Sequence, residues 1–376
     1  MCIRDRTECF QERATWDWID ENCPQEVQAA FWNRVNRVWN CVDLDELSHV
    51  VDKLLGVKRA FTAADVVNMA NPQNVALDVD LAFRVLLAGL SAETNEESIE
   101  RREVYPIQQL IAFVQSEAAD RHDDLLQIEW GYLSLLDRHS SQTRPVSLFN
   151  AMKKNPNWYV DLLKLVFRER GDETERPEPT PQEESRYRNA HDLLDTFATI
   201  PGTQEDGSIV GEELRQWTDR VRELATVANR IEVTDSYLGG LFSKCPRPAR
   251  PTEGEEEGAA TENAGEADED NQERELTPEA LHWPPVEVCR VMEQIGADDM
   301  FNGSAIGVHN SRGATWRNPL AGGSLERARA AHYRQLAAHH ENDFPRLAAT
   351  FRGMAENMQH NAVREDEESE RMRLER

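Results

Sequence analysis

Residues 212–230, with the sequence EELRQWTDRVRELATVANR, show the clearest helical pattern of the chain. Apolar residues recur every three or four positions along this stretch: Leu214, Trp217, Val221, Leu224, Ala225 and Ala228. This spacing places them on one face of an α-helix. Glutamates open the stretch and an arginine ends it, as the helix dipole favours. The stretch therefore predicts an amphipathic helix that packs its apolar face against other helices.

The same periodicity continues outward over most of the chain. We expect further helices over residues 26–40, 44–55, 62–69, 72–90, 96–117, 122–138, 146–154, 158–168, 187–199, 237–243, 286–295, 325–341 and 344–364. Pro106 predicts a kink or break, because proline cannot donate to the helical hydrogen-bond ladder. Short loops between successive helices favour antiparallel neighbours, and no fixed-period repeat is visible. The predicted fold is all-α: stacked antiparallel helical hairpins that form a bundle or an irregular α-solenoid, with a disordered acidic linker.

The composition excludes several classes of protein. The 376 residues include 42 Lys and Arg against 69 Asp and Glu, which gives a net charge of −27. Only 19 Gly and 17 Pro are present, which argues against turn-dense all-β folds. No run of apolar residues is long enough for a membrane-spanning helix, so no membrane association is expected. The negative charge argues against broad binding of nucleic acids or anionic membranes.

Shifts in composition predict five regions. We expect an amino-terminal helical region over 8–171, a Pro/Glu-rich linker over 172–184, a middle helical segment over 185–245, a disordered acidic linker over 246–278 and a carboxyl-terminal helical module over 279–366. Residues 246–275 of this linker hold eleven acids between Glu253 and Glu275, opposed there only by Arg274, and have no aromatic or branched apolar residue. It cannot bury enough apolar surface to order itself. It is either a solvated linker or an acidic segment that binds a partner.

The cysteines indicate a reducing compartment. The chain has six: Cys2, Cys9, Cys23, Cys41, Cys245 and Cys289. No pair has C-x-x-C spacing, and six is too few for a disulfide scaffold of this length. Nothing resembles a secretory signal. We therefore expect a cytoplasmic protein with buried or incidental thiols.

A Gly/Arg loop over residues 303–324, GSAIGVHNSRGATWRNPLAGGS, is the most unusual stretch. It carries arginines and no acid in an otherwise acidic chain. Gly322 and Gly323 precede a predicted helix, and Ser324 is expected to be its N-cap. Backbone amides at such a helix start can approach an anion. The predicted site for a phosphate or carboxylate consists of Arg312, Gly313, Arg317, Gly322, Gly323 and Ser324.

A second interpretation of this loop stays open. The glycines can supply positive φ angles and the arginines can cap helix carbonyls, so that the loop only packs across helix ends. Neither G-x-x-x-x-G-K-[ST] nor G-x-G-x-x-G is present, which argues against a nucleotide hydrolase. Binding of nucleic acid through Arg312 and Arg317 remains possible.

No catalytic, metal or cofactor site is predicted. The segment Asp206-Gly-Ser208 superficially suggests a calcium loop but lacks the required oxygen spacing. His332 and His339 lie two helical turns apart, too far for i, i+4 chelation, and no H-E-x-x-H occurs. Acidic residues are so abundant that no carboxylate pair of a hydrolase stands out. We therefore expect a protein that is not an enzyme and has no cofactor.

Several short blocks carry a resemblance. They are NPNWYVDLLKLVF at 155–167, IGVHNSRG at 306–313, GGSLER at 322–327, FPR at 344–346 and RED at 364–366. These blocks resemble the carboxyl-terminal region of large, mostly helical, uncharacterised bacterial proteins, some of which are labelled helix-turn-helix regulators. The resemblance implies a regulatory or defence-related role and names no catalytic residue. Residues 1–7, MCIRDRT, resemble a translated sequencing adapter, so we expect the rear part of a longer protein.

These observations favour a non-enzymatic helical scaffold or interaction region with a protein partner. Four tryptophans, Trp16, Trp18, Trp32 and Trp39, cluster near the start of the chain. Exposed tryptophans would suit a partner surface, whereas burial is commoner. The alternative function is a phosphate-binding or nucleic-acid-binding module that uses the Gly/Arg loop. The oligomeric state is not predicted.

Overall fold

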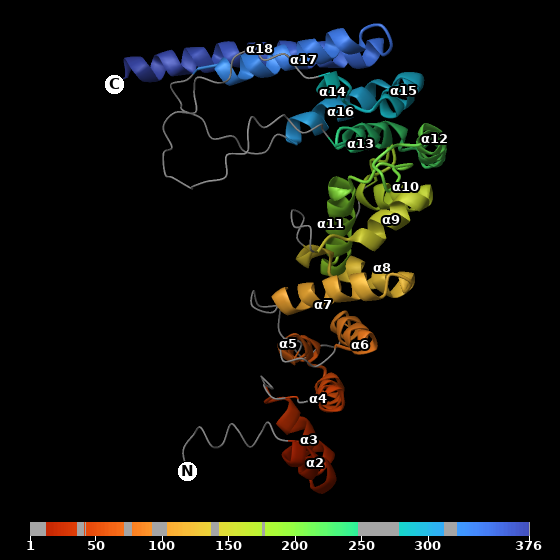
Figure 1. Cartoon of the computed structure of the whole chain (residues 1–376), viewed down its shortest axis with the longest axis vertical. Helices are drawn as coiled ribbons and strands as arrows, with labels where there is room; N and C mark the ends of the chain where they lie inside the picture. Colours follow the sequence, from red (N-terminus) through yellow and green to blue (C-terminus); the bar gives the residue numbers. More distant parts are fainter. Residues whose placement is uncertain are drawn as a thin grey trace. The chain divides into compact units, whose positions relative to one another are not determined.

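Helices make up the regular structure of this protein in a computed structural model of the whole chain (Figure 1). The structure describes residues 13–35, 41, 43–70, 77–91, 104–136, 143–174, 177–246, 278–311 and 322–375. Within these residues no strand is present, and an isolated antiparallel bridge joins Thr203 to Ile209. The all-α prediction is confirmed. The chain divides into two compact units, Met1–Asn150 and Ala151–Arg376.

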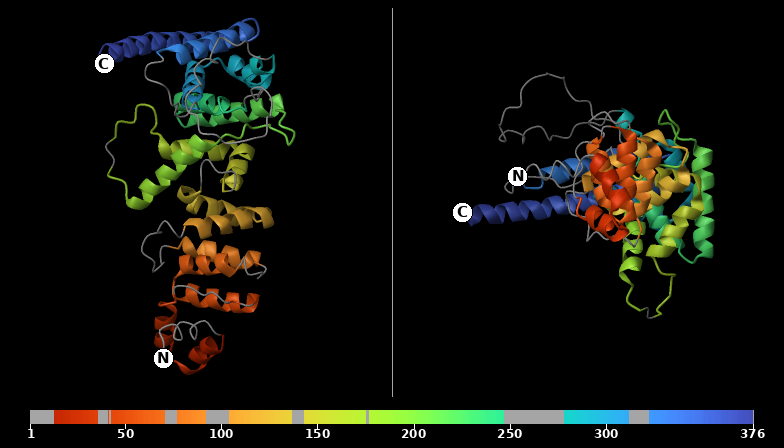
Figure 2. Two further views of the ribbon diagram at one scale, coloured as in Figure 1. Left: turned by 60° about the vertical axis from the view of Figure 1, so that its left-hand side comes forward. Right: turned by 90° about the horizontal axis from the view of Figure 1, so that it is seen from below.

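The helices of the amino-terminal unit pack in successive layers (Figure 2). They are α2 (Arg13–Asn22), α3 (Gln25–Trp32), α4 (Leu44–Gly56), α5 (Ala60–Ala70), α6 (Val79–Gly89), α7 (Val104–Glu117), α8 (His122–Gly131), the short 3-10 helix η3 (Leu133–Leu135) and the start of α9 (Val146–Lys154). α5 contacts α4, α6 and α7, and α7 contacts α8. Aliphatic side chains such as Val50, Val67 and Leu86 are fully buried between these layers. The expected bundle-like packing is therefore present in this unit.

Side-chain caps fix where these helices begin. The Asp43 carboxylate accepts from the amide of Glu46 at 2.9 Å at the start of α4. The Asp78 carboxylate does the same for Leu81 at 3.0 Å at the start of α6. Each bond satisfies an amide that has no partner within its own helix. Pro106 lies in the first described turn of α7, where its missing amide costs no helical hydrogen bond.

The carboxyl-terminal unit holds the remaining helices. They are the end of α9, α10 (Pro156–Val166), α11 (Pro181–Thr196), α12 (Gly211–Val227), α13 (Ile231–Phe242), α14 (Pro278–Leu281), α15 (Val286–Ile295), α16 (Asp298–Asn310), α17 (Ser324–His340) and α18 (Pro345–Leu374). α15 has the predicted bounds. The predicted helical hairpin at the end of the chain is α17 packed on α18, which continues beyond the expected end at 364. Among the described helices, none combines the length and apolar character that a membrane span requires.

The predicted linker over 172–184 is partly helical. α11 begins at Pro181, and Thr180 forms a capping box with Glu183. The Thr180 hydroxyl accepts from the Glu183 amide at 3.3 Å, and the Glu183 carboxylate accepts from the Thr180 amide at 2.9 Å. The Pro/Glu composition suggested a linker, but proline at the first helical position and glutamate at the third also start helices. Most of the predicted acidic linker lies outside the described residues.

The first part of the predicted Gly/Arg loop is helical, and the expectation of a loop there was wrong. Gly303 to Asn310 form the second half of α16. The glycines suggested a loop because glycine disfavours helices by about 1 kcal/mol relative to alanine. Here Gly303 and Gly307 lie one turn apart on the face of α16 that packs against α13. Tertiary packing outweighs the low helix propensity.

Candidate functional site

The predicted anion site falls partly within the described residues. Arg312, Gly313 and Arg317 lie outside them, whereas Gly322, Gly323 and Ser324 are described. α17 begins at Ser324, so Gly323, which has no side chain to accept from the first helix amides, takes the N-cap position expected for Ser324. Gly322 has a φ of 63°, which favours glycine.

A carboxylate of the chain itself contacts the start of α17. The Gly323 amide donates to Asp366 Oδ1 at 2.9 Å, and Arg327 forms an ion pair with the other oxygen of Asp366. The Gly323 amide, followed by the Arg327 ion pair, lowers the pKa of Asp366 below its usual value. This contact brings together the blocks GGSLER and RED, which lie far apart in the sequence. The Gly323 amide, which the sequence predicts to approach a bound anion, thus already binds the carboxylate of Asp366.

Glycines allow α13 and α16 to touch backbone to backbone. A Cβ atom on Gly239 of α13 would lie 1.9 Å from the carbonyl oxygen of Met300. A Cβ atom on Gly303 of α16 would lie 1.9 Å from the carbonyl oxygen of Ser236. No real side chain fits at such distances. The glycines are therefore packing residues here, and they position the polar groups beside them.

A pocket of about 380 Å³ lies beside this crossing, between α11, α13 and α16. Lys244 reaches across it and donates to the carbonyl oxygens of Asp195 and Phe197, the latter at 3.1 Å. Burial lowers the pKa of Lys244. The ammonium group satisfies carbonyls at the end of α11, where the helix dipole favours a cation. Asn310 and Ser311 also line the pocket, and Arg312 follows directly in the sequence.

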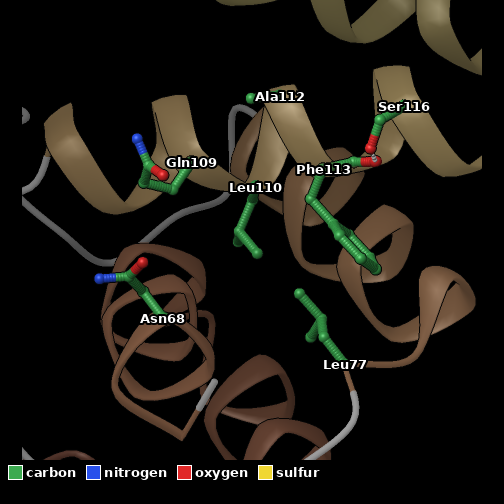
Figure 3. Close-up of a pocket in the computed structure, with 7 residues that line it drawn as sticks. All are labelled: Asn68, Leu77, Gln109, Leu110, Ala112, Phe113 and Ser116. Atoms are coloured by element: carbon green, nitrogen blue, oxygen red, sulfur yellow. Dashed lines mark hydrogen bonds between the residues drawn. The ribbon is translucent and has the colours of Figure 1, made fainter. Parts of the chain in front are cut away.

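A second pocket, of about 280 Å³, lies in the amino-terminal unit (Figure 3). Its lining comes from α5, from α7 and from the segment just before α6: Asn68, Leu77, Gln109, Leu110, Ala112, Phe113 and Ser116. Asn68 and Gln109 form one side, while Leu77, Leu110 and Phe113 converge on the other. The Ser116 hydroxyl donates to the Phe113 carbonyl at 2.9 Å. The described residues of the lining combine two carboxamides with an apolar floor, and none of them carries a charge.

The described cysteines and tryptophans are mostly buried. Burial raises the pKa of Cys41 to about 11 and of Cys245 and Cys289 to about 12, which suppresses the reactive thiolate. Cys41, Cys245 and Cys289 are thus buried, as expected, and Cys23 is half-buried; Cys2 and Cys9 lie outside the described residues. Trp16 and Trp32 are buried with ring centroids 6.0 Å apart, and Trp18 is exposed. Trp39 lies outside the described residues.

Sequence analysis missed both pockets because their linings come from separate helices. Only the carboxamides of Asn68 and Gln109 could have indicated a site from the sequence. Single Asn and Gln residues are too common in proteins to do so. No protein-family model, curated protein or solved structure matches the chain.

Proposed function

We propose that this chain is a helical scaffold that binds an extended segment of a protein partner in the pocket between α5 and α7. We call this pocket the carboxamide groove and define it by Asn68, Gln109, Leu77, Leu110 and Phe113. The absence of charge among its described lining residues is the observation that carries the proposal, because 30% of the whole chain is charged. A partner segment with apolar side chains can enter it without desolvating an ion.

The two carboxamides suit a peptide backbone. Each offers both donors and an acceptor, as a peptide group does. Asn68 and Gln109 come from different helices, α5 and α7, and lie on the same side of the groove. The apolar floor opposite them can bury one partner side chain. At about 280 Å³ the groove is smaller than most pockets for small molecules, which favours a peptide side chain as occupant.

The contact at the start of α17 favours this function over anion binding. Among the described amides of the predicted anion site, that of Gly323 already donates to Asp366. An external phosphate would have to displace that carboxylate. The resemblance to helical bacterial proteins supports a regulatory or defence-related setting for the scaffold. An anion site formed by Arg312 and Arg317 remains the alternative proposal.

Selection of peptides on the intact chain tests the proposal. A displayed random-peptide library is enriched on the wild type and then compared on Gln109→Glu, which places a charge in the groove at nearly constant shape. We expect enriched peptides with an apolar anchor that bind the wild type and lose binding to Gln109→Glu. Tyr105→Ala is the matched control, because Tyr105 is exposed on the same helix outside the groove. Equal binding to both variants would contradict the proposal.

A further inference from the structure

Two histidines from distant parts of the sequence meet in the carboxyl-terminal unit. His282 directly follows α14, and His339 lies in the last turn of α17. Nε2 of His339 lies 3.3 Å from Nδ1 of His282, although 57 residues separate them. Their ring centroids are 4.8 Å apart and the ring planes cross at 83°. Both side chains are exposed, so an ion from solvent can reach them.

The separation of the two nitrogens matches a metal site. Zinc binds imidazole nitrogen at about 2.0–2.1 Å in tetrahedral geometry, which places two such nitrogens about 3.3–3.4 Å apart. A typical N–H hydrogen bond is shorter, about 2.9–3.0 Å between heavy atoms. We propose that His282 Nδ1 and His339 Nε2 form a two-histidine site for a divalent transition-metal ion such as Zn²⁺. This inference does not rest on the proposed scaffold function.

Binding requires both facing nitrogens to present a lone pair. In the metal-free pair, one of these nitrogens carries a hydrogen that points toward the other. That hydrogen moves through water to the other nitrogen of the same ring, and both facing nitrogens then donate an electron pair to the ion. Two neutral rings release no net proton in this step. Among the described residues no third His, Cys, Asp or Glu joins the pair, so water completes the coordination sphere.

The residues next to the pair hold it in place. Trp283 follows His282 and His340 follows His339, and Nε2 of His340 lies 3.1 Å from the Trp283 carbonyl oxygen. The Trp283 indole also donates to the Cys245 carbonyl at 3.1 Å. These contacts fix the backbone beside both rings, so an ion meets a preformed pair.

Imidazole pairs select particular metals. Neutral imidazole suits Zn²⁺, Ni²⁺ and Cu²⁺, whereas Mg²⁺ prefers oxygen ligands. The sequence pattern could not indicate the pair. Helical spacing in the sequence pairs His332 with His339 on one helix, whereas the structure places the partner of His339, His282, before α15. α14 contacts α17, and this contact brings His282 and the end of α17 together.

Titration calorimetry of the untagged full chain with Zn²⁺ at pH 7.5 tests the site. The comparison includes His282→Ala, His339→Ala and, as a matched control, His360→Ala, which removes another exposed histidine of the ten in the chain. We expect one ion per chain that His360→Ala retains. Each variant of the pair should weaken binding by about 100-fold or more, because even outer-shell changes cost 10–100-fold. Mg²⁺ should give no binding at this site.

Imidazole ¹⁵N signals provide a second measurement on the wild type alone. Zn²⁺ should shift the signals of His282 Nδ1 and His339 Nε2 and leave those of His360 in place. Circular dichroism checks that the variants keep their helices. Unchanged Zn²⁺ affinity in a His282→Ala/His339→Ala double variant would overturn the proposal. Zinc shifts at other histidines without shifts at this pair would overturn it as well.

Discussion

The aliphatic layers of the amino-terminal unit and the crossing of α13 and α16 in the carboxyl-terminal unit bring helices together by different means. In the amino-terminal unit, branched aliphatic side chains such as Val50, Val67 and Leu86 separate the helices. In the carboxyl-terminal unit, α13 and α16 meet at Gly239 and Gly303 with no side chain between their backbones. The first kind of contact leaves a hydrophobic period in the sequence. The contact between backbones instead leaves glycines in the sequence, and reading the sequence by hydrophobic period assigns glycines to loops.

The difference also predicts how each unit tolerates substitution. An aliphatic layer loses stability when atoms are removed, because cavities form. A glycine crossing loses stability when atoms are added, because backbone atoms cannot move aside. Variants in the two units therefore test the comparison from opposite directions.

The largest effect is expected at the glycine crossing. Gly303→Ala places a Cβ atom 1.9 Å from the Ser236 carbonyl oxygen, so α16 must move away from α13. We expect the free energy of unfolding to fall by about 3 kcal/mol, measured by urea denaturation. Gly353→Ala in α18 is the control, because nothing lies within 4 Å of the added atom. That control should gain about 0.5–1 kcal/mol. If Gly303→Ala were as stable as the wild type, the contact between α13 and α16 would tolerate an added side chain, and the distinction between the two kinds of contact would fail.

The next effect concerns a buried carboxylate in the amino-terminal unit. Glu129 is fully buried, and its carboxylate accepts from the side chain of Gln115 at 2.7 Å and from the amides of Ser147 and Leu148 at 3.0 and 2.9 Å. Burial raises the pKa of Glu129 against these hydrogen bonds, which lower it. Glu129→Ala leaves the first amides of α9 without an acceptor.

We expect Glu129→Ala to cost about 2–3 kcal/mol of unfolding free energy, measured by the same urea titration. Glu129→Gln should cost less, because its carbonyl oxygen can still accept one of these bonds. A loss for Glu129→Ala no larger than for Gln115→Ala would show that the α9 amides find another partner.

A smaller, pH-dependent effect is expected in the carboxyl-terminal unit. Burial lowers the pKa of His340 in the folded state, so the unfolded chain binds a proton more readily. The contribution of neutral His340 to the free energy of unfolding is fully present above about pH 6.5, the pKa of histidine in the unfolded chain. This contribution is lost as the pH falls through the pKa of His340 in the folded protein. A single titrating group changes the free energy of unfolding by at most about 1.4 kcal/mol per pH unit.

Thermal unfolding between pH 7.5 and 5 measures this effect. The wild type should lose stability on acidification more steeply than His340→Gln, whose amide can still donate to the Trp283 carbonyl. Parallel pH profiles of the two proteins would mean that His340 does not titrate differently on folding.

The smallest effect is expected where α17 begins. Asp366→Asn removes the charge that Gly323 and Arg327 contact, at a side chain that is 40% exposed. We expect a loss of about 0.5–1 kcal/mol at pH 7. The folded pKa of Asp366 is lowered, so this contribution is present above its unfolded pKa of about 3.9 and is lost as the pH falls further. Chemical denaturation at pH 7 and pH 3 should show a difference between Asp366→Asn and the wild type only at pH 7.

Side-chain periodicity explains which parts of the fold the sequence predicts. α15 has its predicted bounds, and the hairpin of α17 and α18 is present, because apolar residues recur at helical spacing there. Gly303 to Asn310 were missed because contacts between backbones leave no such pattern. Thr180 and Glu183 do carry a helix-start signal, and the Pro/Glu composition around them concealed it.

The candidate sites were harder to predict than the helices. Gly322 and Gly323 do precede a helix start that contacts an anion, but that anion is Asp366, from the far end of the next helix. Glu129 contacts the start of α9, and His339 meets His282, across gaps that local patterns do not cover. The carboxamide groove needs α5 and α7 side by side. Each of these features depends on tertiary contacts that a single sequence does not encode locally.

The affinity of a selected peptide for the carboxamide groove tests the central claim most directly. Its dissociation constant is measured by calorimetry for the wild type and for Asn68→Ala/Gln109→Ala. Loss of two hydrogen bonds of about 1 kcal/mol each predicts binding weaker by roughly 30-fold. Ile306→Ala, at an exposed position of the carboxyl-terminal unit, should bind like the wild type. Equal affinities for the wild type and the double variant would contradict a peptide-binding scaffold at this groove.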